Sequence, residues 1–238
     1  MTVKQRNLGL VVFVVILVAV CILYYDGVLD KGPQGNHIWR QTDCLSITKK
    51  YEDGASFLEP EMHLLWADNY TTGKSAGEFP GLYYITGNLW KLTGESFLAY
   101  RLIWLIVMVC GLMALFRSVQ ILFDSNFWAG AITLLVFASP AYAFYGVSFL
   151  SDGPAFGFLL MSLYFLLLYQ KQGKVKWLYW FAGMMAISGL LKASMLIAFV
   201  FLGIIYLLET LFNVKSLPGQ KLFKDKWHGF LAMAIVLV

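Results

Sequence analysis

Five polar residues of this chain have types that could carry or support chemistry, although they are scattered along the sequence. Three are carboxylates and two are cations: Asp43, Glu78, Asp152, Arg40 and Lys192. A carboxylate held in one position can act as a general base or a metal ligand. A cation can bind a phosphate or another anionic group. These types predict a functional site, provided that the fold brings them to one place.

Each carboxylate also has a purely structural interpretation. Thr42 or Asp43 is placed to be the N-cap of a short amphipathic helix, since a side-chain oxygen can satisfy the first free amides. Glu78 precedes Pro80, which suits the first turn of a helix, and would interact favourably with that helix N-terminus. Asp152 stands before Gly-Pro at the start of an apolar run, where capping is again the simpler role.

The two cations leave similar alternatives open. Arg40 could pair with Asp43 or bind a phosphate. Lys192, in "SGLLKASM", could extend to the membrane surface without a further role or offer its charge to an anionic group there. Trp39 is typical of an interfacial anchor.

The composition indicates a membrane protein. Hydrophobic residues make up 59% of the 238 residues and charged residues only 13%, whereas soluble domains carry about a quarter charged residues. Runs of roughly 18 or more apolar residues are typical of bilayer-spanning helices. We therefore expect an all-α polytopic transmembrane helical bundle, with spans at about 8–25, 97–116, 127–145, 148–169, 177–191 and 193–212 and a partial span at 228–238.

The distribution of charge predicts the topology. With a cytoplasmic N-terminus, the inner segments hold ten Lys or Arg residues, against only Asp124 and Asp225, as the positive-inside rule requires. The long segment 26–96 then lies outside and carries interfacial helices. All five candidate residues fall at this extracytoplasmic face. The incomplete last span indicates that 1–238 is the N-terminal part of a longer transmembrane domain.

Other motifs contribute little. His37 and His63 have no second histidine four residues away, so a metal site has weak support. Asn69-Tyr70-Thr71 matches a glycosylation sequon. The net charge of +4 does not indicate nucleic-acid binding, and we expect no nucleic-acid partner.

The order of the landmarks resembles a known group. An acidic residue opening the first outer loop (Asp43), "EFPGLYYITGNLWKLTG", "AYRL", "SDGP" and "LKAS" follow one another as in the GT-C superfamily of membrane glycosyltransferases that use polyprenyl-phosphate-linked sugars. The chain is most similar to the protein O-mannosyltransferase and lipid A aminoarabinose transferase group. It departs from that group at Phe79, where the aminoarabinose transferases have Lys, and at Cys44, where the mannosyltransferases have Glu.

This resemblance implies a function for each candidate. Asp43 would be the catalytic carboxylate that deprotonates or orients the acceptor, Glu78 and Asp152 would line the same cavity, and Lys192 and Arg40 would face the lipid-linked phosphate. It implies inverting sugar transfer to an unknown extracytoplasmic glycan, lipid or protein, and it leaves a divalent-cation cofactor open. "H-x-W-R-Q-x-D" resembles bacterial members, so we expect an integral protein of the bacterial plasma (inner) membrane.

Two other functions remain as alternatives. One is a transporter or flippase-like protein for lipid-linked sugars, and the other is a non-catalytic membrane scaffold. A second half of the protein that mirrors the first would favour transport.

Overall fold

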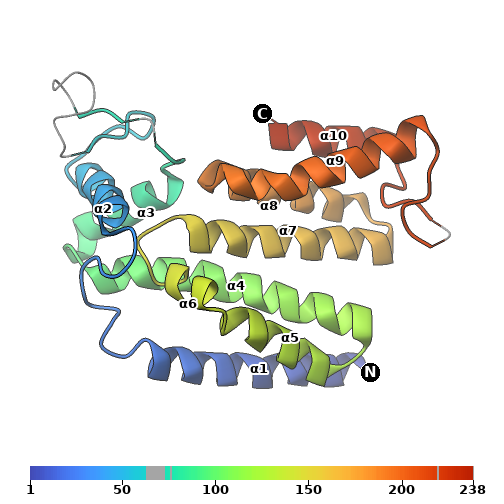
Figure 1. The fold of residues 1–238 in the computed structure, drawn as a ribbon, viewed down its shortest axis with the longest axis horizontal. Coiled ribbons are helices and arrows are strands. Elements are labelled where there is room, and N and C mark those ends of the chain that lie inside the picture. Colours follow the sequence, from blue (N-terminus) through green and yellow to red (C-terminus); the bar gives the residue numbers. More distant parts are fainter. Residues whose placement is uncertain (63–72, 76, 219, 238) are drawn as a thin grey trace. The chain divides into compact units, whose positions relative to one another are not determined.

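The computed structural model describes residues 1–62, 73–75, 77–218 and 220–237, and its secondary structure within them is helical, apart from two isolated β-bridges. The all-α prediction is confirmed. His63 and the sequon Asn69-Tyr70-Thr71 lie outside the described residues. The helices are α1 (Val3–Tyr24), α2 (Ile38–Glu52), α3 (Gly81–Thr93), α4 (Phe97–Phe123), α5 (Asn126–Phe137), α6 (Pro140–Tyr145), α7 (Asp152–Gln172), α8 (Val175–Leu191), the 3₁₀ turn η2 (Ala193–Met195), α9 (Leu196–Leu211) and α10 (Lys226–Leu237) (Figure 1).

Four of these helices are long and apolar enough to cross a bilayer: α1, α4, α7 and the continuous stretch Ala193–Leu211. The apolar helices α5, α8 and α10 are shorter. The predicted span 127–145 is interrupted because Ser139 caps α6, its hydroxyl accepting from the Tyr142 amide at 3.3 Å, and Pro140 follows at the first helical position. A proline there has no amide to continue the preceding helix. The chain is an integral membrane protein.

The chain forms two compact units. We call Val11–Met108 with Leu135–Pro154 the loop unit, because it contains the long segment after α1. Met1–Leu10, Val109–Leu134 and Ala155–Val238 form the helix unit. Asp43, Glu78, Asp152 and Arg40 belong to the loop unit, and Lys192 belongs to the helix unit.

In the loop unit, α2 packs closely against α3. Gly87, in the middle of α3, allows this approach: a Cβ placed there would lie 2.6 Å from the Thr48 carbonyl oxygen and 2.7 Å from Tyr51 Cβ. Thr48 and Tyr51 are fully buried on the facing side of α2. A side chain at position 87 would therefore force the two helices apart, since packed interiors leave little free space.

The first turns of α4 hold the segment 147–150 through its main-chain carbonyls. Tyr100 Oη donates to the Phe149 carbonyl at 2.8 Å, and Trp104 Nε1 donates to the Leu150 carbonyl at 2.7 Å. Arg101 donates to the Val147 carbonyl at 2.8 Å and lies over the Phe149 ring. Buried carbonyls need such partners, and so the residues just before α7 have a fixed path.

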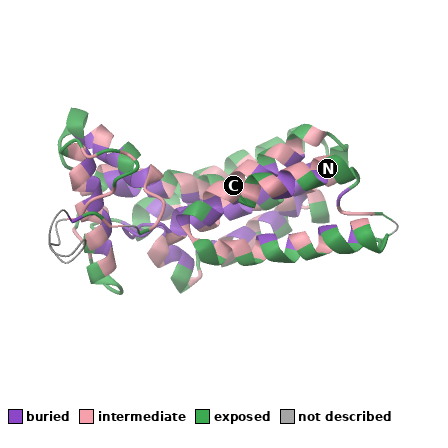
Figure 2. Cartoon of the chain, turned by 90° about the horizontal axis from the view of Figure 1, so that it is seen from above, coloured by how far each residue is buried: buried purple, intermediate pink, exposed green. Residues whose placement is uncertain are grey.

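The helix unit has a continuous apolar core formed by α7, α8, α9 and α10. Ser188 on α8 donates its hydroxyl to the Ala155 carbonyl on α7 at 2.7 Å. Many large apolar side chains on these helices are nevertheless exposed, among them Ile197 and Leu211. Figure 2 colours the exposed residues of the chain green. An apolar exterior is expected where lipid rather than water surrounds the helices.

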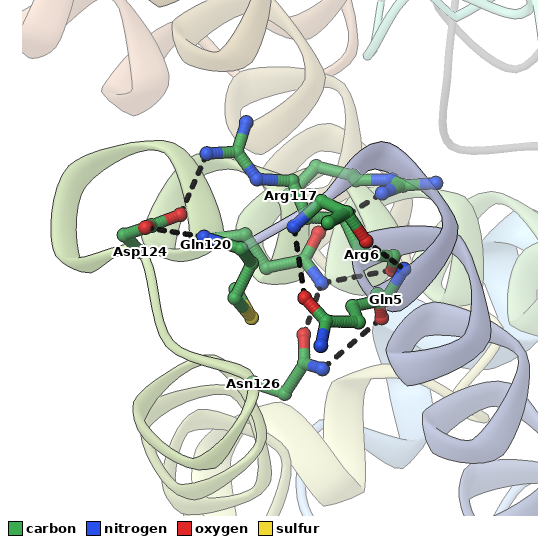
Figure 3. Close-up of polar contacts among 8 residues, drawn as sticks. Gln5, Arg6, Arg117, Gln120, Asp124 and Asn126 are labelled. Atoms are coloured by element: carbon green, nitrogen blue, oxygen red, sulfur yellow. Dashed lines mark hydrogen bonds and ion pairs between the residues drawn. The ribbon is translucent and has the colours of Figure 1, made fainter.

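A polar network joins the start of α1 to the link between α4 and α5 (Figure 3). Asp124 accepts from Arg6 at 2.6 Å, and the side chain of Gln120 donates to both the Arg6 carbonyl and the Asn126 side chain. Arg117 donates to Asn7 Oδ1 at 2.7 Å. Arg6 and Arg117, two of the basic residues that predict a cytoplasmic end, thus help to connect the start of α1, the end of α4 and the start of α5.

Candidate active site

An ion pair links α2 to the segment that precedes α3. Arg40, in the first turn of α2, donates from Nη2 to Glu78 Oε1 at 2.5 Å. Both side chains are partly buried, with 30% and 22% of their areas exposed. A charge-assisted hydrogen bond in such surroundings is stronger than one in open solvent.

The second oxygen of Glu78 is also used. Glu78 Oε2 accepts from the Tyr83 hydroxyl at 3.2 Å and from the Ser151 hydroxyl. Tyr83 is fully buried, and its oxygen also lies 3.2 Å from Cys44 Sγ. Burial raises the pKa of Tyr83 well above its ordinary value, so this hydroxyl stays protonated and can donate. Glu78 is therefore a fixed anion that joins three separate segments.

Asp43 lies in the second turn of α2, and the prediction that Thr42 or Asp43 caps this helix is wrong. The helix begins five residues before Asp43, at Ile38; the N-cap residue His37 adopts the left-handed conformation (φ 57°) and makes no side-chain cap hydrogen bond. The Thr42 hydroxyl instead donates to the Ile38 carbonyl at 2.8 Å. The Asp43 carboxylate is thus not needed for capping.

Asp43 and Arg40 are three residues apart and hence neighbours on one face of α2. Burial raises the pKa of the Asp43 carboxyl above its ordinary value, and the Arg40 charge opposes this rise only in part. The direction of the shift shows that desolvation outweighs the nearby cation.

The side chains of Arg40, Asp43 and Glu78 line one cavity of about 170 Å³. Trp39, one helical turn before Asp43, lies at the same cavity and is 68% exposed. The cavity therefore combines a carboxylate, an ion pair and an aromatic plane. Its lining residues are Trp39, Arg40, Asp43, Cys44, Ile47, Met62, Gly77, Glu78 and Tyr83.

The sequence predicts that Arg40 pairs with Asp43 or binds a phosphate, but its main contact in the structure is a different one. Its hydrogen-bonded partner is Glu78, whereas Asp43 influences it only through electrostatic attraction. The prediction that Glu78 serves only to interact with a helix N-terminus is likewise too simple, because its oxygens accept from side chains on α2, on α3 and in the segment before α7.

The structure places the remaining candidates as follows. Asp152 is the first residue of α7 and directly follows Ser151, which contacts Glu78. Lys192 belongs to the helix unit, where it separates α8 from η2 in an extended conformation (φ −154°, ψ 106°) and is half-buried. Arg40, Asp43 and Glu78 are brought to one cavity.

Sequence reasoning missed three contributors, Tyr83, Cys44 and Ser151. Tyr83 is five residues beyond Glu78, close enough to hydrogen-bond back to it across the start of α3, and this spacing was a usable clue. Ser151 and Cys44 gave no such clue, because their contacts span 73 and 39 residues. Within the part of the chain that the structure describes, no three His, Cys, Asp or Glu side chains form a group that could hold a metal ion.

The helical fold and its long apolar helices are those of a polytopic membrane protein. The carboxylate and the ion pair at one cavity give this protein a polar site. The sequence model of the family described as dolichyl-phosphate-mannose-protein mannosyltransferase matches residues 77–238, and the chain belongs to this family. It is thus a membrane glycosyltransferase of the GT-C type. Neither the curated proteins nor the solved structures contain a match to the chain.

The family match covers some of the candidates and not others. Glu78, Asp152 and Lys192 lie within the matched range, whereas Arg40 and Asp43 precede it. The case for Arg40 and Asp43 therefore rests on their geometry around Glu78.

Proposed function

We propose that this glycosyltransferase moves a sugar from a polyprenyl-phosphate donor to an extracytoplasmic acceptor with inversion, and that Asp43 is its catalytic carboxylate. The observation that carries the proposal is the position of Asp43 at the cavity wall, beside an Arg40–Glu78 pair that is itself fixed. The family match supports the general activity.

The chemistry requires a base on one face of the sugar and a leaving phosphate on the other. Asp43 accepts the proton of an acceptor hydroxyl as that oxygen bonds to the anomeric carbon. The bond between this carbon and the phosphate oxygen breaks, and the polyprenyl phosphate departs with the electron pair. A carboxyl with a raised pKa is a stronger base in its ionised form, which favours this role.

A cation takes the complementary role in this proposal. Arg40, which lines the cavity with Asp43, stabilises the negative charge that grows on the phosphate. Glu78 acts on Arg40 by fixing the guanidinium through a short ion pair. Glu78 is thus a positioning residue. Asp152 would add a carboxylate near it, because Asp152 directly follows Ser151, whose hydroxyl donates to Glu78.

Charge distribution supports the orientation that we propose. Basic residues are concentrated in the segments assigned to the cytoplasm, and ten acids lie in the segment 26–96. The site then faces outward from a bacterial plasma membrane that the chain crosses six times, with a partial seventh span and residues 26–96 as the outer loop.

The test compares Asp43→Asn with wild type in the full-length protein. Sugar transfer is measured from a radiolabelled polyprenyl-phosphate mannose donor, with membranes of the producing cell as the acceptor source. We expect turnover to fall by about 10²–10⁴ while donor binding is kept. Asp53→Asn is the matched control, since Asp53 is exposed at the end of the same helix. Near-normal turnover in Asp43→Asn would overturn the assignment, and donor translocation without transfer would favour a flippase.

A further inference from the structure

The helix unit contains a larger cavity than the candidate active site, and nothing described so far uses it. It measures about 470 Å³, within the range of small-molecule sites. Six of its twelve lining residues are leucines of α4 and α7, and two of these, Leu122 and Leu163, are exposed. The lining residues are Leu115, Ser118, Leu122, Leu160, Leu163, Leu166, Leu167, Gln170, Lys171, Leu217, Gln220 and Leu222. We call this the leucine groove.

One wall of the groove is a short segment after α9 that is held firmly in place. Glu209, 1% exposed, accepts from the Phe223 amide at 2.8 Å and from the Leu222 amide at 2.5 Å. The side chain of Gln170 donates to the Leu222 carbonyl. A carboxylate that accepts two main-chain amides fixes the backbone around it, so the groove is a preformed feature of the unit.

Two lysines lie at or next to residues of the groove. Lys171 is exposed in the last turn of α7 and lines the groove. Lys224 Nζ donates to the carbonyl of Gln170, the preceding residue, at 2.7 Å. Lys171 is therefore part of the groove, and Lys224 is bonded to the backbone of another lining residue, Gln170. The acids of the helix unit, Asp124, Glu209 and Asp225, do not line the groove.

We propose that the leucine groove binds one acyl chain of an anionic phospholipid, with the lipid phosphate at Lys171 and Lys224. A leucine-lined groove on spanning helices is filled by hydrocarbon rather than water. The two lysines provide the charge complementarity that selects an anionic headgroup over a zwitterionic one. This inference is independent of the proposed transfer reaction.

The test uses the purified, delipidated full chain and native mass spectrometry. Dioleoyl phosphatidylglycerol and dioleoyl phosphatidylcholine have the same chains and differ in net headgroup charge. We expect one phosphatidylglycerol to be retained about fivefold or more over phosphatidylcholine, the factor that a surface lysine contributes. Lys171→Gln with Lys224→Gln should abolish this preference. Lys174→Gln, which removes an exposed charge that does not line the groove, should leave it unchanged.

A second pair of variants tests the apolar wall. Leu163→Trp, which fills the groove, should reduce retention of both lipids, whereas Ile197→Trp on the exposed face of α9 should not. Equal retention of the two lipids by wild type, or a preference that survives the double lysine variant, would overturn the proposal. Displacement of phosphatidylglycerol by equimolar polyprenyl phosphate would also overturn it, because the occupant would then be an isoprenoid chain.

Discussion

Arg40 Nη2 lies 2.5 Å from Glu78 Oε1, so that a side chain of α2 is bonded to a residue 38 positions later, just before α3. Arg40 is thus hydrogen-bonded to Glu78, and Asp43, which lines the same cavity, feels its charge. The pair therefore holds in place a cation whose charge partly offsets the effect of burial on the pKa of Asp43.

Glu78→Gln should lower the free energy of unfolding by about 1.5–3 kcal/mol, the usual contribution of a hydrogen bond to a charged group. It should also reduce turnover, because Arg40 loses its anchor. Thermal unfolding in detergent and the transfer assay measure the two effects. The control is Glu59→Gln, which breaks the more exposed Lys74–Glu59 pair (2.9 Å) and should cost less than about 1 kcal/mol. Equal losses in the two variants would contradict a special role for Glu78.

The pH dependence of activity should reflect the raised pKa of Asp43. A base works only when ionised, so turnover should fall as the pH drops through a value above the ordinary ~3.9 of aspartate. Arg40→Gln removes the charge that lowers this pKa and should move the acidic limb to higher pH. If the acidic limb of the pH profile does not move in Arg40→Gln, the group whose titration limits turnover is not Asp43.

The same shift predicts how Asp43 affects stability. Because its pKa is higher in the folded state than in the unfolded state, folding takes up protons, and Asp43 lowers stability as the pH rises from the unfolded value through the folded one. Asp43→Asn should therefore unfold at a slightly higher temperature than wild type at neutral pH, although we expect its turnover to be strongly reduced. Unfolding curves at neutral and mildly acidic pH measure this, and the difference should shrink at the acidic end.

Gly87→Ala should separate α2 from α3, because its Cβ would lie 2.6 Å from the Thr48 carbonyl oxygen. We expect a loss of about 1–3 kcal/mol, the cost of overpacking. Gly183→Ala is the matched control, since a Cβ in the middle of α8 meets nothing within 4 Å and should stabilise that helix by up to ~1 kcal/mol. Thermal unfolding of both variants gives the comparison, and a neutral Gly87→Ala would contradict the close packing of the two helices.

Cys44 should react slowly with a water-soluble maleimide. Burial raises its thiol pKa to about 12, so very little of the reactive thiolate is present at neutral pH. Labelling should become fast only when the loop unit opens, and Cys44→Ala should remove the labelled site that mass mapping assigns to this residue. Rapid labelling of Cys44 in the native protein would show that Tyr83 and α2 leave the thiol accessible.

The sequence by itself determined the class of the protein. Long apolar runs specify spanning helices whatever their neighbours are, because the bilayer leaves the backbone few alternatives. Local patterns were also informative: Pro80 comes directly before α3, and Asp152 begins α7. The start of α2 was mispredicted because Thr42 and Asp43 are good capping residues, whereas the helix begins at Ile38, after an N-cap residue, His37, that makes no side-chain cap hydrogen bond.

Only the tertiary structure decided the partner of Arg40. From the sequence, Arg40 could pair with Asp43, three residues away, or bind a phosphate, and Glu78, 38 residues away, was not among the expected partners. The packing of α2 on α3, which requires a glycine at position 87, brings Glu78 within hydrogen-bonding distance of Arg40. Contacts of this kind depend on which helix faces meet, and that is set by the fit of many side chains rather than by local sequence.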